Sequence, residues 1–242
     1  MTTHRSLAVV TGVLFIIATV AGLASTMLLA PILTSPDYIS RIAANENQVL
    51  LGALFQFIAA AACPAIAMAL YPVLRRFNEG QALAAVGFRL IEGTLYVLVV
   101  VSLLLLVSLS REAASTGATG SVVEIPGALL LAARDWLSPV GAVLTFGLGA
   151  VMYYSVFYRS RLVPRWLAMW GLAGATLLTV SGLLVMFGAA TPLGSTQTLM
   201  AGPIALQEMV LAVWLIAKGF SSAPDAPGYR TSRATARLSV AP

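Results

Sequence analysis

The sequence is poor in charge, in histidine and in cysteine. Only 10% of its 242 residues are Asp, Glu, Lys or Arg, whereas a soluble domain averages about 25%. The only histidine, His4, is near the N-terminus, which argues against histidine-based metal sites, intramembrane haem ligation and Ser-His catalysis. The only cysteine, Cys63, excludes an intrachain disulfide and a cysteine-built metal cluster. We therefore expect no metal and no cofactor.

Two motifs that carry chemistry are also missing. No GxxxxGK phosphate-binding loop occurs. No aspartate lies deep in an apolar segment, which argues against a paired-aspartate intramembrane protease. Only Glu92 and Glu208 are left as acid–base candidates, and no nucleophile accompanies them. An intramembrane enzyme is therefore the weakest hypothesis, and we assign no catalytic residue.

Apolar residues, by contrast, are abundant. They make up 59% of the chain, and the mean hydropathy is +0.92. Such a chain has too little polar surface to face water, so the lipid bilayer is its solvent, and a helix crosses it with about 20 apolar residues. The pattern predicts an all-α integral membrane bundle of six transmembrane helices, forming one domain over residues 1–220. The predicted spans cover about residues 7–30, 49–71, 82–109, 136–158, 166–187 and 202–220.

The segments between the spans differ in character. A short interfacial helix is expected after Ser35-Pro36-Asp37, where Ser35 can cap the first turn. Residues 110–120 read as a polar, flexible loop, and residues 126–134 as a short interfacial helix before Asp135-Trp136 opens span four. The tail 221–242 is rich in Pro, Ser and Arg and is predicted to be disordered. We expect the first span to stay uncleaved, because its apolar run exceeds that of a signal peptide.

Small residues at helical spacing predict close helix contacts. In span two they surround Gln56, which is expected to hydrogen-bond across the contact. Spans four and five are predicted to pack as an antiparallel pair, and Tyr153, Tyr154, Phe157 and Tyr158 to form an aromatic belt. The small-residue faces are Gly52, Ala53, Ala59, Ala60 and Cys63 in span two, Gly141, Thr145 and Gly149 in span four, and Gly171, Ala175 and Thr179 in span five.

The net charge of +5 is distributed unevenly. Ten Lys and Arg residues fall on the side of the two termini and three on the other, which by the positive-inside rule predicts a cytoplasmic N-terminus and C-terminus, N-in/C-in. Basic residues beside a membrane contact anionic lipids, so we expect lipid rather than nucleic acid as their partner. The residues assigned to this contact are Arg75, Arg76, Arg159, Arg161 and Arg165.

Span three carries two charges well inside its ends. Arg89, Glu92, Gly93 and Tyr96 recur at helical spacing and form one polar stripe. Each charge costs at least about 2.5–3.5 kcal/mol in hydrocarbon, so the helix needs a partner or water for them. Arg89 can pair with Glu92 one turn away. Either this pair is neutralised and only fixes packing, or it lines a wet cavity in which Arg89 binds an anionic group.

Span six contains Gln207 and Glu208. Counted from residue 202, Glu208 lies about 8–9 Å below the outer interface and Arg89 about 10 Å from the inner one, so direct pairing is not assured. Glu208 is either a neutral acid bonded to Gln56 or a backbone carbonyl, or a proton-carrying or cation-binding carboxylate. We expect one polar core between spans two, three and six. Its predicted members are Gln56, Arg89, Glu92, Tyr96, Gln207 and Glu208.

Several long phrases resemble a bacterial family of multi-pass membrane proteins, the domain of unknown function DUF4386. The resemblance extends to Phe220 and implies a helical membrane protein of the bacterial cytoplasmic (inner) membrane, without an activity or a residue role. The phrases are LYPVLRR (Leu70–Arg76), GFRLIEG (Gly87–Gly93), LLLAARDW (Leu129–Trp136), YRSRLVPRWLAMWG (Tyr158–Gly171) and PIALQEMVLAVWLIAKGF (Pro203–Phe220).

Two functional hypotheses follow. In the first, the protein binds or transports a small molecule or ion at the buried Arg/Glu cluster. In the second, it is a structural or interaction protein whose buried charges only fix helix packing. Replacing Arg89 with Leu separates them, because the first predicts a folded protein without binding and the second a lower yield of folded protein. The sequence names no protein partner.

Overall fold

The structure, a computed structural model, describes residues 2–192 and 194–221. Within them six helices are long and apolar enough to cross a membrane, which confirms the predicted all-α bundle of six transmembrane helices. The tail, apart from Ser221, lies outside the described residues. The helices are α1 (Thr2–Leu33), α3 (Glu46–Leu74), α4 (Glu79–Thr116), α5 (Ser121–Trp136) continuing through the π-helical turn η1 (Leu137–Ala142) into α6 (Val143–Ser160), α7 (Arg165–Met186) and α8 (Ser195–Ala217), with the short α2 (Tyr38–Ala44) between α1 and α3.

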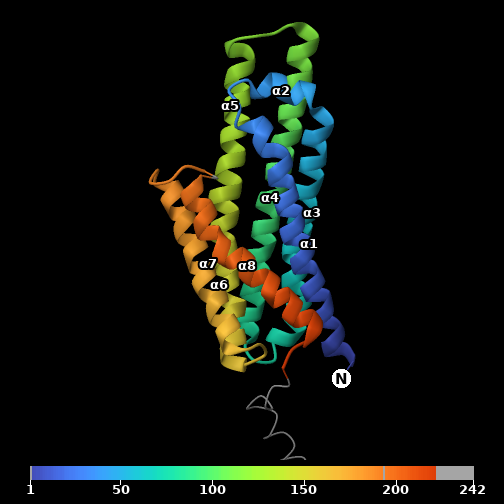
Figure 1. The fold of residues 1–242 in the computed structure, drawn as a ribbon, viewed down its shortest axis with the longest axis vertical. Coiled ribbons are helices and arrows are strands. Elements are labelled where there is room, and N and C mark those ends of the chain that lie inside the picture. The colour runs from blue at the N-terminus through green and yellow to red at the C-terminus, as the bar shows by residue number, and fades with distance from the viewer. Residues whose placement is uncertain (1, 193, 222–242) are drawn as a thin grey trace, which may run out of the picture.

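The two ends of the described chain lie at the same end of the bundle, which we call the terminal end (Figure 1). The opposite end, with α2 and the α4–α5 turn, is the distal end. An even number of crossings produces this arrangement. Seven basic residues of the described chain lie at the terminal end (Arg5, Arg75, Arg76, Arg159, Arg161, Arg165 and Lys218) and three at the distal end (Arg41, Arg111 and Arg134).

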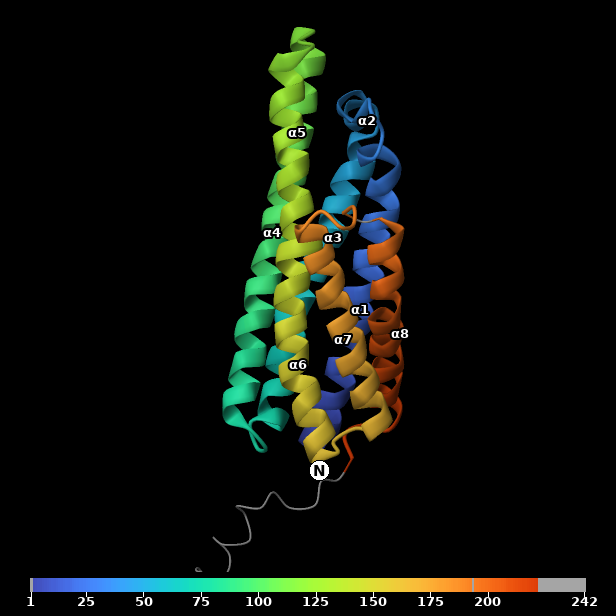
Figure 2. The ribbon, with the colours of Figure 1, turned by 90° about the vertical axis from the view of Figure 1, so that its left-hand side faces the viewer.

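The helices differ strongly in length, so the bundle is stepped. At 1.5 Å per residue, α7 and α8, with 22 and 23 residues, are about 33–35 Å long, whereas α4, with 38, is about 57 Å long. Because the helices start level at the terminal end, the whole difference appears at the distal end. Figure 2 shows the α4–α5 hairpin extending well past the α7–α8 connection.

This extension corrects two predictions. Residues 110–120 are not a flexible loop, because α4 continues to Thr116 and only a short turn with left-handed Gly117 and Gly120 follows. Span four does not begin at Asp135-Trp136, since one unbroken helical stretch runs from Ser121 to Ser160. The apolar pattern marks where hydrocarbon surrounds a helix, and these two helices continue past that boundary.

A separate apolar core supports the distal extension. It joins α1, α2, α3 and α4 through Leu29, Ile42, Val49, Leu103 and Leu106, all nearly inaccessible. The side chain of Arg111 in α4 also pairs with Glu46 at the start of α3. The distal end of the bundle is therefore packed from side chains of its own.

The predicted short helix after Asp37 is present as α2, but its entry differs from the prediction. Ser35 does not cap the helix amides and instead donates its hydroxyl to the Asp37 carboxylate. Arg41 donates to the same carboxylate at 3.0 Å. These two contacts hold the pKa of Asp37 below its ordinary value, with the Ser35 hydrogen bond as the larger cause.

Glycines set the closest helix contacts. A Cβ built on Gly52 would lie 2.7 Å from Leu29 of α1, and one on Gly93 would lie 2.8 Å from the backbone oxygen of Ala60. The predicted hydrogen bond of Gln56 is confirmed, because the hydroxyl of Ser25 in α1 donates to its side-chain oxygen. Span two therefore uses its small residues against both neighbours.

The antiparallel pairing of spans four and five is confirmed, since α6 packs against α7. The contact uses other residues than predicted in span four. Gly147 faces Thr179, and Gly171 faces the ring of Tyr154. Gly141 and Gly149 face Leu95 and Phe88 of α4. The predicted small face of span four is therefore the one on which α4 rests.

Candidate functional site

Arg89 and Glu208 lie at the same depth in the bundle. Arg89 is ten residues after Glu79, where α4 begins at the terminal end, and Glu208 is ten residues before Lys218, where α8 ends. Both side chains thus start about 15 Å from the terminal end. The depth of Glu208 estimated from the sequence is wrong, because α8 begins at Ser195 rather than at residue 202.

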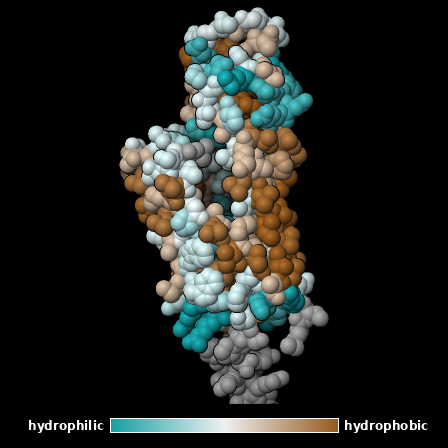
Figure 3. Space-filling model, in the orientation of Figure 1, coloured by the Kyte–Doolittle hydropathy of each residue, from teal (hydrophilic) through white to brown (hydrophobic). Residues whose placement is uncertain are grey.

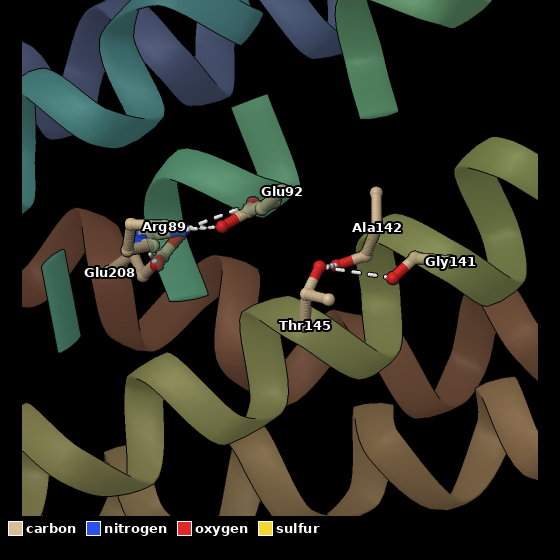
Figure 4. A network of polar contacts seen from close by, with 6 residues as sticks. All are labelled: Arg89, Glu92, Gly141, Ala142, Thr145 and Glu208. Atoms are coloured by element: carbon tan, nitrogen blue, oxygen red, sulfur yellow. Dashed lines mark hydrogen bonds and ion pairs between the residues drawn. The ribbon is translucent and has the colours of Figure 1, made fainter. Parts of the chain in front are cut away.

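The guanidinium of Arg89 lies between two carboxylates. Its Nη1 donates to Oε2 and Oε1 of Glu92 at 2.8 and 3.1 Å, one turn along α4. Its Nη2 is 3.8 Å from Oε1 of Glu208 in α8. Figure 4 shows the three side chains directed toward one another, near the α6 segment that carries Thr145. Arg89 therefore pairs with both carboxylates, with Glu92 at hydrogen-bond distance and with Glu208 at a longer distance.

Two aromatic rings of α6 complete the surroundings of Arg89. The guanidinium carbon is 4.8 Å from the centroid of the Phe146 ring and 5.8 Å from that of Tyr153. Such cation–π contacts strengthen when water is excluded. Gly149, between these two positions, leaves room for the Arg89 stem, since a Cβ there would be 3.5 Å from the Arg89 Cγ. The cluster of Arg89, Glu92 and Glu208, called the charge cluster below, thus has an aromatic wall.

The charge cluster carries more negative than positive groups. One guanidinium faces two carboxylates, and the side chains of Arg89 and Glu92 are each only 3% exposed. Ionised groups in such a position need full compensation. Glu208 is the less enclosed carboxylate, with 14% of its side chain exposed. An added proton or cation at Glu208 would balance the charges.

Three polar atoms in or beside the charge cluster have no hydrogen-bond partner in the part of the chain that the structure describes. They are Nε of Arg89, Oε1 of Glu208 and the hydroxyl of Tyr153, and all three are buried. Buried polar atoms are nearly always hydrogen-bonded, and each that is not costs about 1–3 kcal/mol. These three atoms could therefore hydrogen-bond to a further small polar species.

Gln207 and Glu208, although adjacent, serve different neighbours. Gln207 is fully buried, accepts a hydrogen bond from the Tyr154 hydroxyl at 2.5 Å and donates to the backbone oxygen of Leu167 at 3.0 Å. It therefore ties α8 to α6 and α7. The predicted polar core contains Gln207 only as a neighbour of the charge cluster.

The other two predicted members lie at its margin. Gln56 accepts from Ser25, so the alternative in which Glu208 bonds Gln56 is wrong within the described residues. Tyr96 is half-buried, one turn from Glu92 on the same stripe. Cys63 of α3, in contrast, is buried beside Glu92. The structure thus brings together Arg89, Glu92 and Glu208, with Tyr96 and Gln207 next to them along α4 and α8, whereas Gln56 contacts Ser25 of α1.

Sequence reasoning missed the contribution of α6. Tyr153, Tyr154 and Phe157 are completely buried, so the predicted aromatic belt is wrong for these three, and only Tyr158 is at the surface. A signal was present, because Phe146 and Tyr153 are seven residues apart and flank Gly149 on one helix face. That face packs against the helix that carries Arg89.

The predicted Arg134-Asp135 pair is present at the distal part of α5, with 2.8 Å between Nη1 of Arg134 and Oδ1 of Asp135. It lies within a continuous helix rather than at a helix start, so the predicted role of opening span four is wrong. Its two charges neutralise each other in place. In the part of the chain that the structure describes, no group of three or more His, Cys, Asp or Glu side chains is placed to hold a metal ion.

The comparisons with known proteins identify a family. The model of the family described as domain of unknown function DUF4386 matches residues 10–219. No curated protein and no solved structure matches the chain. The match includes the charge cluster and all of the six candidate spans except the start of the first.

Proposed function

The chain is a multi-pass membrane protein that belongs to the DUF4386 family of unknown function, and we propose a function from its geometry. In this proposal the protein binds a proton or a small cation at Glu208 and moves it. The observation that carries the proposal is the charge count of the cluster. Two carboxylates face one guanidinium in the interior of a membrane bundle, and Oε1 of the second carboxylate has no hydrogen-bond partner among the described residues. Intramembrane ionisable groups typically mark ion pathways.

The same count disfavours an anionic ligand at Arg89. Its guanidinium already faces Glu92 and Glu208 and lies over two rings, so an incoming anion would have to displace a carboxylate. A positive species meets no such obstacle. We therefore prefer a proton or a monovalent cation over the carboxylate-bearing ligand that Arg89 alone suggested.

Infrared difference spectroscopy tests the proposal. Purified protein in lipid nanodiscs is titrated from alkaline to acid pH while the carbonyl stretch of protonated carboxyl groups is recorded. We expect one buried carboxyl band that Glu208→Gln removes and that Glu79→Gln, at the exposed start of α4, leaves in place. Na⁺ or K⁺ is then added at constant pH. Loss of the protonated carboxyl band would show that the cation competes with the proton for Glu208, and an unchanged band would show that the site binds protons only.

Two outcomes would contradict the proposal. A titrating band that persists in Glu208→Gln would place the exchangeable proton elsewhere. The absence of any buried band, with no change in thermal stability on adding either cation, would leave Glu208 without a ligand. A folded Glu208→Gln variant, checked by its elution from size-exclusion chromatography, is required for either reading.

One observation favours the structural alternative. The Arg89–Glu92 pair is formed within one helix and is almost completely enclosed, so it neutralises itself without help from α8. If the cluster only fixes packing, Arg89→Leu should lower the yield of folded protein, and Glu208→Gln should behave like the unaltered chain in ion binding because neither binds an ion. Preserved cation binding in folded Arg89→Leu would instead show that the carboxylates act as a site.

We further propose that the terminal end faces the cytoplasm of a bacterial cell and that the cytoplasmic (inner) membrane is the location. Seven basic residues at the terminal end against three at the distal end support this orientation. A reporter fused after Pro242 should be reachable only from the cytoplasm. Reporter access from the periplasm would reverse the orientation.

The basic terminal end is also proposed to contact anionic lipids, through Arg75, Arg76, Arg159, Arg161 and Arg165. Each such residue near an anionic surface contributes about 1 kcal/mol. Arg161 holds a left-handed backbone conformation at the end of α6, in the turn that presents this group. Thermal stability should rise in anionic over zwitterionic nanodiscs, and substituting Arg159 and Arg161 with Gln should reduce that rise.

A further inference from the structure

Helices α1 and α8 touch at the terminal end. The guanidinium of Arg5 donates to the backbone oxygen of Ile216 at 2.6 Å, and a Cβ on Gly12 would lie 2.7 Å from the backbone oxygen of Ala212. The first part of α8 packs elsewhere. A Cβ on Gly174 of α7 would be 3.0 Å from the Cα of Ile204. The two helices therefore diverge towards the distal end.

Burial decreases along one face of α1 as the two helices diverge. Phe15 is completely buried. Gly22, seven residues later on the same face, has no atom within 4 Å of an added Cβ, and Thr26 beyond it is exposed. Side chains thus fill the contact up to Phe15 and leave it open from Gly22 onwards.

The facing row of α8 has the same pattern. Ala212 is fully buried, whereas Ala205 and Ala201, seven and eleven residues nearer the distal end, are partly exposed. Figure 3 shows the surface hollowed between α1 and the distal half of α8, with hydrophilic colouring inside. We call this hollow the α1–α8 opening; Gly22 and Thr26 of α1 and Ala201 and Ala205 of α8 are the open positions on the two helices that border it.

Glu208 lies at the inner limit of the α1–α8 opening. It precedes Ala212 by one turn in the same row, and it is the only member of the charge cluster with appreciable exposure, at 14% against 3% for Arg89 and Glu92. The member of the charge cluster on the row that borders the opening is therefore the carboxylate whose Oε1 has no hydrogen-bond partner among the described residues. Both helices are long and apolar enough to cross a membrane, so an opening between them would face lipid.

We propose that the α1–α8 opening admits an amphiphile with a positively charged head, such as an alkylammonium, sideways from the distal leaflet. This inference rests on the proposed function and names a ligand class for the same carboxylate. The ammonium head reaches Glu208 and compensates the second carboxylate. The alkyl chain lies between the small residues of α1 and α8, where hydrocarbon meets alanine and glycine at little cost in packing.

Photolabelling of the full chain in nanodiscs tests this proposal. The probe is a long-chain primary alkylamine with a diazirine in its chain, and the comparison probe is the neutral alcohol of the same length. The amine should label peptides around residues 19–26 and 201–208, and the alcohol should not. Glu208→Gln should reduce labelling at least about tenfold, because it removes the charge that holds the head.

Gly22→Trp provides a second variant outside the charge cluster. Its indole fills the open space, so labelling should again fall at least about tenfold if the amphiphile passes there. Gly87→Trp is the matched control, because Gly87 also has nothing within 4 Å of an added Cβ but lies on α4, away from the opening. That variant should label like the unaltered chain.

The outcomes separate this inference from the proposed function. Equal labelling by amine and alcohol would overturn it, since the opening then holds only neutral lipid chains. Undiminished labelling in Gly22→Trp or Glu208→Gln would overturn it as well. If the Glu208 carboxyl band titrates but the amine does not label the protein, the proposed ion binding stands and the amphiphile proposal is wrong. If labelling depends on Glu208 but no carboxyl band titrates, the amphiphile proposal stands and the proposed ion binding is wrong.

Discussion

Arg89 and Glu208 face each other at 3.8 Å in the interior of the bundle, and no hydrogen bond completes their contact. Glu92 occupies the other side of the guanidinium at 2.8 Å. The first pair joins two helices, whereas the second joins two turns of one helix. Substitutions in the charge cluster can therefore separate the contribution of the Arg89–Glu92 pair to stability from the role of Glu208 as a binding site.

Loss of the Arg89 charge should be strongly destabilising. In Arg89→Met the carboxylate of Glu92 stays buried without its partner, and breaking a buried ion pair in this way costs about 3–5 kcal/mol. The double variant Arg89→Met/Glu92→Gln should recover most of that loss. Unfolding in detergent mixtures measures both, and an unchanged midpoint for the single variant would contradict the ion-pair account.

Gly93 should not tolerate a methyl group. Its added Cβ would lie 2.8 Å from the backbone oxygen of Ala60, which cannot turn aside as a side chain could. Gly93→Ala should therefore push α3 and α4 apart and lower the unfolding free energy by about 1–3 kcal/mol. Gly87→Ala, in the same helix but facing open space, should stay within about 0.5 kcal/mol of the unaltered chain.

Arg5 should act as a cap for α8. Its guanidinium reaches the backbone oxygens of Leu215, Ile216 and Ala217 in the last turn of α8, where helical amide donors run out; the Leu215 oxygen also accepts from the amide of Gly219. Arg5→Gln should weaken the last turn of α8 by about 1–2 kcal/mol. Amide hydrogen exchange in residues 214–219 should accelerate, while Arg76→Gln, an exposed residue of the α3–α4 turn, should leave it unchanged.

The Arg111–Glu46 pair should contribute little and depend on salt. The Arg111 side chain is 60% exposed, and exposed pairs contribute about 0.2–1 kcal/mol. A double-mutant cycle with Arg111→Gln and Glu46→Gln should give a coupling in that range that shrinks with added salt. A coupling that salt does not change would mean that the distal end excludes water.

Acid should loosen α2 through Asp37. Because the Ser35 hydroxyl and Arg41 hold the pKa of Asp37 below its ordinary value, its stabilising effect is full above that ordinary value. It is lost as the pH falls through the lowered pKa. Exchange of the α2 amides, corrected for intrinsic rates, should therefore increase at the acid end, and Asp37→Asn should remove the pH dependence.

The apolar pattern predicted the membrane crossings well and the helix ends poorly. Six apolar runs gave six spans because each must be surrounded by hydrocarbon. The start of α8, at Ser195, carries few apolar residues, so nothing in the pattern distinguishes it from a loop. The depth of Glu208 was misjudged for this reason alone.

The environment of Arg89 was only half predictable. Glu92 follows from helical spacing on the same segment, a purely local rule. Phe146 and Tyr153 come from another helix, and their inward direction depends on which face of α6 meets α4. A row of small residues predicts a close helix contact but does not show which helix makes it. The pattern therefore placed Gly149 against α7, whereas it lies against α4.

The stepped outline has a consequence for the surrounding lipid. The apolar stretch of α4, residues 82–109, is about 42 Å long, while α7 measures about 33 Å from end to end. A hydrocarbon layer is about 30 Å thick, so the annulus around the protein has to stretch on one flank and can relax on the other. Bilayers built from progressively longer acyl chains should therefore change the tilt of the molecule gradually and favour neighbours that meet flank to flank.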